Sequence, residues 1–355
     1  MTASANDPRK FFRGSVAISG GRISSVLPAT PDNGSDDRGT ESENRSRRVI
    51  DAGGKLLMPG LINLHNHVAM SLMRNYADDL PLMEWLADRV WPFEAKLTGD
   101  DVYLGARLGI AEMLLGGTTT FVDMYWHADR VAEAVLESGM RAVVCPAFID
   151  TNYEAFERET VRLVERYAGA DGGRLGVRVA PHAPYTCSPE SVRKALSLCE
   201  KYGLGIHVHL SETRSETETI RQRYDKTSAE YLRDLGVFDY PTLAVHCVHL
   251  TEEDMDILFR YGVSVAYNPQ SNMKLASGIA PVARMIGRGL TVGIGTDGPC
   301  SNNDLDMWDE MRTASLLQKV ATGDASVLPA YETLRMATVG GACAVGMEGE
   351  LGVVA

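Results

Sequence analysis

Two histidines separated by one residue end an apolar segment of the chain. His65 and His67 close the run Leu56–His67, which is rich in branched apolar residues. Such a run is typical of a buried β-strand, where residues i and i+2 point to the same face. Two imidazoles on one face can bind one divalent metal ion. Because packed or surface histidines fit the same pattern, the metal hypothesis depends on further donors.

Other titratable residues also follow apolar segments that resemble strands. Seven of the eight histidines lie at or just after such segments: His65, His67, His182, His207, His209, His246 and His249. Asp297 ends another one, between Gly295 and Gly298, and Glu212 comes three residues after His209. Residues at the carboxyl ends of parallel strands meet at one face of a barrel, so this pattern favours one metal-assisted site.

The sequence supplies enough donors for one metal ion with a position left for water. We expect His65, His67, His209 and Asp297 to be the ligands, with a turn residue as the less favoured reading of Asp297. His207 shares a face with His209 but lies deeper in the strand, so we interpret it as a packed neighbour. The segment 175–182 contains no lysine that could bridge two metals. One divalent metal is therefore predicted, with Zn²⁺ preferred and Fe²⁺ as the alternative.

The spacing of apolar segments predicts eight strands with helices between them. The strands are Gly60–His67, Thr118–Met124, Arg141–Ile149, Leu175–Ala180, Leu204–Leu210, Leu243–Val248, Val263–Asn268 and Thr291–Asp297. Amphipathic segments include Ala106–Leu115, Ala128–Ser138, Pro189–Tyr202, Ser228–Leu235 and Glu252–Tyr261. This alternation indicates an α/β fold of the (β/α)₈ TIM-barrel type. A doubly wound open sheet would need a G-x-G-x-x-G phosphate loop, which the sequence lacks.

The N-terminal part has a different pattern and predicts a small β module. Ser15–Ile18 and Arg22–Val26 flank Gly20-Gly21 as in a hairpin, and Val49–Met58 resumes strand and turn character. The polar stretch Pro31–Arg48 predicts a mobile surface loop. We therefore expect residues 1–58 to begin a small β-sandwich module, residues 59–343 to form the barrel, and residues 344–355 to start a truncated return to the module.

Composition narrows the class of protein. A net charge of −12 makes a nucleic-acid partner improbable, and no apolar stretch reaches membrane-spanning length. Six scattered cysteines without a C-x-x-C motif suggest reduced thiols. Since residues 1–13 are polar and do not form a secretory signal, we expect a cytoplasmic protein with a small-molecule substrate. A homo-oligomer is compatible with the sequence.

With these motifs in place, the chain resembles the amidohydrolase superfamily, from about Ser15 to its C-terminus. Within it, the chain is similar to the 5′-methylthioadenosine/S-adenosylhomocysteine deaminases and their triazine-hydrolase relatives. The matching motifs are Pro59–His67, Leu82–Leu86, His209–Thr213, His246–His249, Asn268–Leu275 and Gly295–Gly298. The resemblance implies metal ligands at His65, His67, His209 and Asp297, substrate contacts at Glu94 and His182, a proton shuttle at Glu212, and a histidine beside the metal-bound water at His246.

The implied reaction is hydrolytic deamination of an adenosine-type nucleoside, catalysed by a hydrolase acting on C–N bonds in cyclic amidines. The metal lowers the pKa of water, Asp297 and His246 accept or orient its proton, and Glu212 protonates the ring nitrogen. Asp297 then returns a proton to the leaving ammonia, so Glu212 and Asp297 both contact the substrate.

The same residues also allow purely structural interpretations. Glu212 lies in a charged stretch and could be a solvated carboxylate, Glu94 could be a helix N-terminal acid, and Trp85 could wall the base or belong to the core. A guanine- or triazine-type hydrolase of the same fold is the alternative function. A catalytically inactive binding barrel is a further one.

Two departures from the resemblance bear on specificity and length. Relatives that use S-adenosylhomocysteine carry an arginine on the third strand for the substrate carboxylate, whereas this chain has Cys145-Pro146-Ala147. Methylthioadenosine, 5′-deoxyadenosine or adenosine is then the better substrate. The second departure is at residues 349–355, where the strands that return to the β module in relatives break off, so we expect the small domain to be incomplete.

Overall fold

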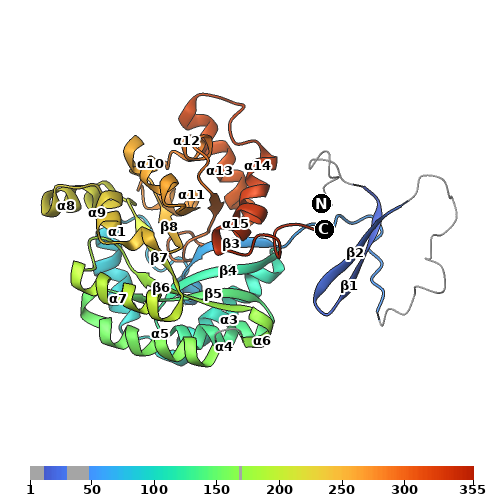
Figure 1. Cartoon of the computed structure of the whole chain (residues 1–355), viewed down its shortest axis with the longest axis horizontal. Coiled ribbons are helices and arrows are strands. Elements are labelled where there is room, and N and C mark those ends of the chain that lie inside the picture. The colour runs from blue at the N-terminus through green and yellow to red at the C-terminus, as the bar shows by residue number, and fades with distance from the viewer. Residues whose placement is uncertain (1–11, 30–47, 168–169) are drawn as a thin grey trace.

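Eight parallel strands form the centre of the molecule (Figure 1). The computed structural model describes residues 12–29, 48–167 and 170–355. The strands pair in chain order: β3 (Leu61–Asn66), β4 (Thr118–Tyr125), β5 (Arg141–Phe148), β6 (Leu175–Pro181), β7 (Gly205–Leu210), β8 (Thr242–His246), β9 (Ser264–Tyr267) and β10 (Val292–Ile294). The N–H of Asp297, just after β10, donates to the carbonyl of His65 on β3 at 2.9 Å. This bond joins the first and last strands, and the expected (β/α)₈ barrel is confirmed.

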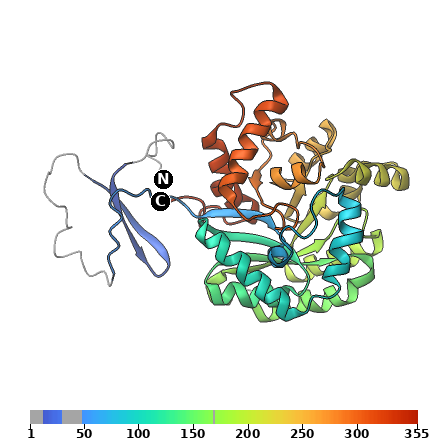
Figure 2. The ribbon, with the colours of Figure 1, turned by 180° about the vertical axis from the view of Figure 1, so that it is seen from behind.

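Helices surround the barrel and connect its strands (Figure 2). They are α1 (Leu82–Glu84), α2 (Trp91–Glu94), α3 (Gly99–Leu115), α4 (Ala128–Ser138), α5 (Tyr153–Tyr167), α6 (Ala170–Gly173), α7 (Pro189–Tyr202), α8 (Arg214–Tyr224), α9 (Ser228–Asp234), α10 (Glu252–Arg260), α11 (Pro269–Lys274), α12 (Val282–Gly287), α13 (Met307–Thr322), α14 (Ala330–Arg335) and α15 (Gly341–Val345). The predicted strands and helices all occur, and most of their ends agree within two residues. Helix α3 begins seven residues earlier than expected, because Thr98 and Asp101 form a capping box there.

Helix α7 shows how local sequence sets an element. The Ser188 side chain accepts a hydrogen bond from the Ser191 N–H at 3.3 Å, and Pro189 occupies the first turn, where a missing N–H costs little. Gly203 ends the helix with a φ of +66°, a conformation that glycine adopts without strain. Between these signals, one apolar stripe that includes Val192 and Leu198 is buried against the barrel.

The barrel interior is a packed core. One cluster of buried side chains draws on six strands at once: Ile62, Leu64, Val122, Met124, Val143, Cys145, Ala147, Ala180, Leu243, Val245 and Ala266. Ala342 and Ala344 of α15 join the same cluster. Burial of apolar surface contributes about 25 cal/mol per Å², so this core and the layer between strands and helices hold the strand ends in fixed positions.

The N-terminal hairpin extends to one side of the barrel in Figure 1. Strands β1 (Gly14–Ser19) and β2 (Arg22–Pro28) pair antiparallel around Gly20-Gly21, both with positive φ. The strand character expected for Val49–Met58 was wrong. That segment makes a turn at Gly53-Gly54 but otherwise has no regular secondary structure, is largely exposed and has no strand pairing. The expected mobile loop, Pro31–Arg48, lies outside the described residues except for Arg48, so it stays a prediction.

The C-terminal segment lies beside the hairpin. Glu350 and Arg22 approach to 3.4 Å, and both side chains are largely exposed, so the pair adds little stability. The domain boundaries at 58 and 343 stay predictions.

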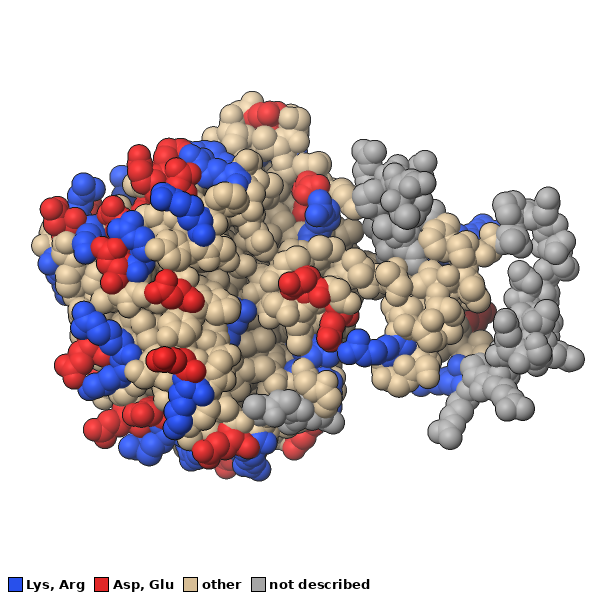
Figure 3. All heavy atoms as spheres, viewed as in Figure 1, with Lys and Arg blue, Asp and Glu red and all other residues tan. Residues whose placement is uncertain are grey.

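The surface carries charges of both signs. Figure 3 shows lysines and arginines interspersed with acidic residues over the visible face of the barrel. None of the six cysteines is in a disulfide, and five of them are buried. Within the described ranges, no helix combines the length and apolar character needed to cross a bilayer.

Candidate active site

Donors from three strands converge at the carboxyl end of the barrel. His65 and His67 come from β3 and the residue after it, His209 from β7, and Asp297 follows β10. The Nε2 atoms of His65 and His67 each lie 3.2 Å from Asp297 Oδ1, and His65 Nε2 lies 3.2 Å from His209 Nε2. Four donors placed tetrahedrally about 2.1 Å from a zinc ion would be separated by about 3.4 Å. The donor set therefore fits a divalent metal ion.

The other nitrogen of each imidazole has its own partner. The Nδ1 of His65 contacts His207 Nε2 at 2.8 Å, His209 Nδ1 contacts the His182 carbonyl at 2.9 Å, and His67 Nδ1 contacts the Met124 carbonyl. Carbonyl acceptors keep the proton on Nδ1 and leave the Nε2 lone pair facing the donor set, as in metal-binding histidines. His207 is fully buried behind His65, where the sequence analysis placed it as a packed neighbour.

Asp297 is held by the backbone as well as by its side-chain contacts. Its φ is +62°, Gly298 N–H donates to Oδ1 at 2.8 Å, and Ser271 Oγ donates to Oδ2 at 2.6 Å. Burial favours the neutral acid, but hydrogen bonds from His65 and His67 outweigh it and hold the pKa of Asp297 well below its usual value. Asp297 is therefore a carboxylate at neutral pH, as a ligand must be.

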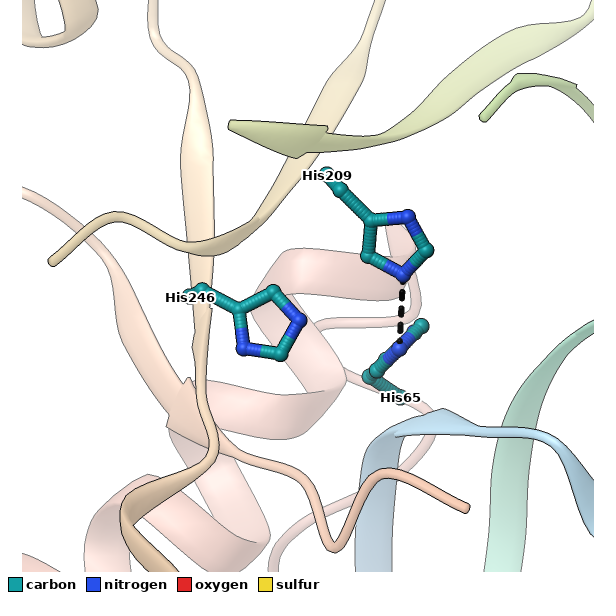
Figure 4. A group of neighbouring side chains, drawn as sticks. All are labelled: His65, His209 and His246. Atoms are coloured by element: carbon teal, nitrogen blue, oxygen red, sulfur yellow. Dashed lines mark hydrogen bonds between the residues drawn. The ribbon is translucent and has the colours of Figure 1, made fainter. Parts of the chain in front are cut away.

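Figure 4 shows His246 on β8 next to His65 and His209. One possible ligand atom from each of these three residues lies within 4.8 Å of the others, so His246 belongs to the same donor cluster. Its Nδ1 is contacted by the side-chain amides of Asn272 at 2.9 Å and Asn268 at 3.3 Å. Burial lowers the pKa of His246 to about 3, so the imidazole is neutral.

Glu212 lies beside His246 and is almost fully buried. Its Oε2 is 3.9 Å from His246 Nε2, and Ser277 Oγ donates to Oε1 at 3.4 Å. Burial, followed by the charges of Asp297 and Glu216, raises the pKa of Glu212 to about 8. A carboxyl group that keeps its proton at neutral pH can act as a general acid.

A cavity opens over these residues and is walled by aromatic side chains. It is lined by His67, His182, His209, Glu212, His246 and Asp297, together with Trp85, Trp91, Glu94, Tyr125, Trp126 and Tyr185. Trp85 therefore lines the site. Glu94 also reaches the cavity, from the end of α2. Glu94 Oε1, Trp85 Nε1 and Tyr125 Oη are buried and make no full hydrogen bond among the described residues. Burial raises the pKa of Glu94, and the nearby Tyr125 and Trp126 side chains partly offset this effect. Such polar atoms can bind a polar ligand.

A second hollow adjoins this cavity and shares Trp91, Glu94 and Trp126 with it. Its other lining residues are Ala95, Leu97, Val102, His127 and Asn152, and no lysine or arginine is among them. Arg158 on α5 is exposed, with Glu154 as its ion-pair partner at 3.9 Å. The hollow therefore suits an uncharged, partly apolar group.

The structure brings together all the residues singled out from the sequence except His249. The Nε2 of that residue contacts the Ser277 carbonyl at 2.8 Å instead of facing the cavity.

Two buried carboxylates near the site, Asp123 and Glu216, were not predicted from the sequence. Asp123 accepts from the Val68 N–H at 2.6 Å, and burial raises its pKa to about 7. The capping-box pattern Thr213-x-x-Glu216 was a signal that the Glu216 side chain turns back toward the preceding loop.

Comparison with known proteins agrees with this geometry. The amidohydrolase family matches residues 56–355. The chain belongs to the amidohydrolase family. A 5-methylthioadenosine/S-adenosylhomocysteine deaminase of Desulforudis audaxviator is 51% identical over 347 residues, which cover 97% of this chain and 78% of the relative. A protein of the same name from Desulforamulus reducens is 52% identical over 308 residues, covering 86% of this chain and 71% of that protein.

Solved structures of two deaminases share the fold. A zinc-bound adenosine deaminase of Xanthomonas campestris superposes with a TM-score of 0.84 at 34% identity, over 96% of this chain and 77% of that one. A guanine deaminase of C. acetobutylicum gives the same TM-score at 24% identity, over 96% of this chain and 82% of that one. At this identity the likeness supports the barrel fold and no shared activity. Within this family the chain is an enzyme, a hydrolase that acts on C–N bonds of cyclic amidines.

Proposed function

We propose that this amidohydrolase deaminates an adenosine-type nucleoside, with methylthioadenosine or adenosine as substrate and the inosine analogue and ammonia as products. The observation that carries the proposal is the buried Glu212, with its pKa raised to about 8, beside the metal-type donors His65, His67, His209 and Asp297. Relatives at about half identity bear the name of this activity. A guanine- or triazine-type hydrolase has no comparable support.

The proposed reaction adds water to C6 of the purine ring and expels ammonia. A divalent metal ion held by the four donors, zinc by preference, would supply the Lewis acidity that makes water nucleophilic near neutral pH. Glu212 donates its proton to the ring nitrogen next to C6, which makes that carbon more electrophilic. The neutral His246 orients the attacking water, and the Asp297 carboxylate accepts one of its protons and passes it to the leaving ammonia. As the C6 carbonyl forms, the remaining hydroxyl proton is lost and restores the acid form of Glu212.

The cavity walls offer groups for the rest of the nucleoside. Trp85 is 4% exposed and presents an aromatic surface to the cavity, which can stack on the base. The free Oε1 of Glu94 can accept hydrogen bonds from ribose hydroxyls, and His182 lies beside His209 with ring centroids 4.8 Å apart. The second hollow beyond Glu94 would take the 5′ substituent, and its lack of a cation favours a thioether or hydroxyl.

A substrate panel with the zinc-loaded chain tests the proposal. We expect the ultraviolet change from adenine to hypoxanthine, with one ammonia released per nucleoside consumed, on methylthioadenosine, 5′-deoxyadenosine or adenosine. Guanine and a chlorinated triazine serve as controls of the same fold. Release of chloride from the triazine, or of ammonia from guanine, with none from the adenosine analogues would overturn the proposal.

A further inference from the structure

The turn that carries Glu212 departs from regular strand geometry. Ser211, the residue after β7, has a φ of +51°, which is unusual for a non-glycine residue. In a continuing strand, residue 212 would face away from residue 209, because side chains alternate between the two faces. The left-handed residue at 211 breaks this alternation, so Glu212 and His209 both line the cavity. Something must stabilise this turn, because left-handed backbone costs energy for a serine.

The side chain of Glu216, in the first turn of α8, binds this turn directly. Its Oε1 accepts a hydrogen bond from the Ser211 N–H at 2.7 Å, and its Oε2 accepts one from the Glu212 N–H at 3.0 Å. Ser228 Oγ, at the start of α9, donates to Oε1 at 2.8 Å. Glu216 is only 2% exposed. A carboxylate that accepts from two successive N–H groups in a buried setting makes strong, geometrically specific bonds.

The same turn also contacts the loop after β8. The Ser211 carbonyl accepts from the Val248 N–H at 3.0 Å and from the His249 N–H at 2.9 Å. His246 has a φ of +69°, so this second loop is also held in a left-handed conformation. Bonds made by Ser211 therefore link the Glu216 carboxylate to the loops that follow two neighbouring strands, β7 and β8.

We propose that Glu216 is a positioning residue, whose carboxylate holds the Ser211 turn so that the Glu212 carboxyl points at the substrate ring. The proposal rests on the deaminase function proposed above. Glu216 itself does not line the cavity and touches no reacting atom.

The variant Glu216→Gln tests whether the Glu216 carboxylate holds the Ser211 turn in place. The amide keeps the size of the side chain, but its one oxygen can accept from only one of the two N–H groups, while its NH₂ faces the other. We expect kcat to fall about 10- to 100-fold, since a displacement of about 1 Å at a reacting group can cost 10²-fold. KM and the metal content should stay within about twofold of the wild-type values. A wild-type kcat, or loss of the metal, would overturn the proposal.

Combination with Glu212→Gln separates positioning from a general structural effect. If Glu216 acts through Glu212, the change Glu216→Gln should lower kcat less than about twofold when residue 212 is already glutamine. An equal loss in both backgrounds would mean that Glu216 acts elsewhere.

Asp254 provides a matched control. It is 1% exposed, accepts from the Thr251 N–H at 2.9 Å at the start of α10, and does not line the cavity. Asp254→Asn should lower the unfolding midpoint but leave kcat within about twofold.

Hydrogen exchange gives a readout that does not need the reaction. Glu216→Gln should increase hydrogen exchange at the amides of Ser211 and Glu212. Unchanged exchange there would refute the proposal that Glu216 holds this turn. A wild-type chain without deaminase activity would instead overturn the proposed function, while the exchange measurement would still test the role of Glu216.

If Glu216→Gln does not fold, Ser228→Ala removes only the third bond to Glu216. We then expect a kcat loss of about two- to tenfold, and an unchanged kcat together with unchanged exchange would refute the proposal.

Discussion

Replacement of Glu212 by glutamine is the sharpest test of the chemistry. With its pKa raised to about 8, the Glu212 carboxyl is mostly protonated at pH 7 and can give a proton to the ring nitrogen. Glutamine has the same shape but cannot donate and recover that proton. General acid–base catalysis contributes about 10²- to 10⁴-fold, so the barrier should rise by about 2.7–5.4 kcal/mol.

The pH profile adds an independent check of the same prediction. Because the acid form of Glu212 is the active one, kcat should fall as the pH rises through about 8 and the carboxyl loses its proton. Glutamine does not titrate, so Glu212→Gln should lose this alkaline limb.

The assay follows the ultraviolet change from adenine to hypoxanthine, with metal content measured on the same sample. Glu218→Gln, at an exposed position on α8, the helix that follows Glu212, is the control and should keep wild-type turnover. Near wild-type kcat in Glu212→Gln with a full complement of metal would remove Glu212 from the mechanism.

Further predictions concern the metal, the substrate and the core. Elemental analysis should find about one divalent metal per chain, and Asp297→Asn should lose most of it; two metals per chain would contradict the proposed site. Methylthioadenosine or adenosine should exceed S-adenosylhomocysteine in kcat/KM by at least about tenfold, and equal efficiency would point to Arg158 swinging in. In denaturant unfolding, Leu64→Ala should cost about 2–5 kcal/mol, whereas Leu104→Ala, at a position 57% exposed, should cost far less. Similar losses for the two variants would contradict the assigned core.

Strand order and the ends of the strands could be predicted because fully buried parallel strands consist of short, continuous apolar runs. All six residues of β3 are buried, for example, and its apolar run was visible in the sequence. Val49–Met58 shows the limit of that reasoning. The segment has strand-forming residues, but the described chain places no partner strand beside it. Pairing is a tertiary property that composition does not encode.

Glu216 could not be located by the same reasoning. It lies in a charged stretch that is typical of a solvated surface, and only the packing of α8 and α9 against the β7 turn buries it. The sequence did contain the capping-box pattern, yet the carboxylate binds the N–H groups of residues 211 and 212 rather than that of Thr213. A local pattern predicted the direction of the side chain but not its partners.

The backbone conformation at the strand ends explains how the side chains of the site are held in fixed directions, which the sequence motifs alone do not specify. Ser211, His246 and Asp297 all have positive φ, at 51°, 69° and 62°, and none of them is glycine. Each left-handed residue lies where a strand leaves the barrel and its chain turns into the cavity. Non-glycine residues in this region are strained, and the strain persists only where the surrounding contacts outweigh it. The contacts are visible here: Glu216 binds the Ser211 turn, Ser211 binds the loop after His246, and the Asp297 N–H binds His65. The strained backbone at these three positions therefore marks the turns that direct the side chains of Glu212, His246 and Asp297 toward the cavity.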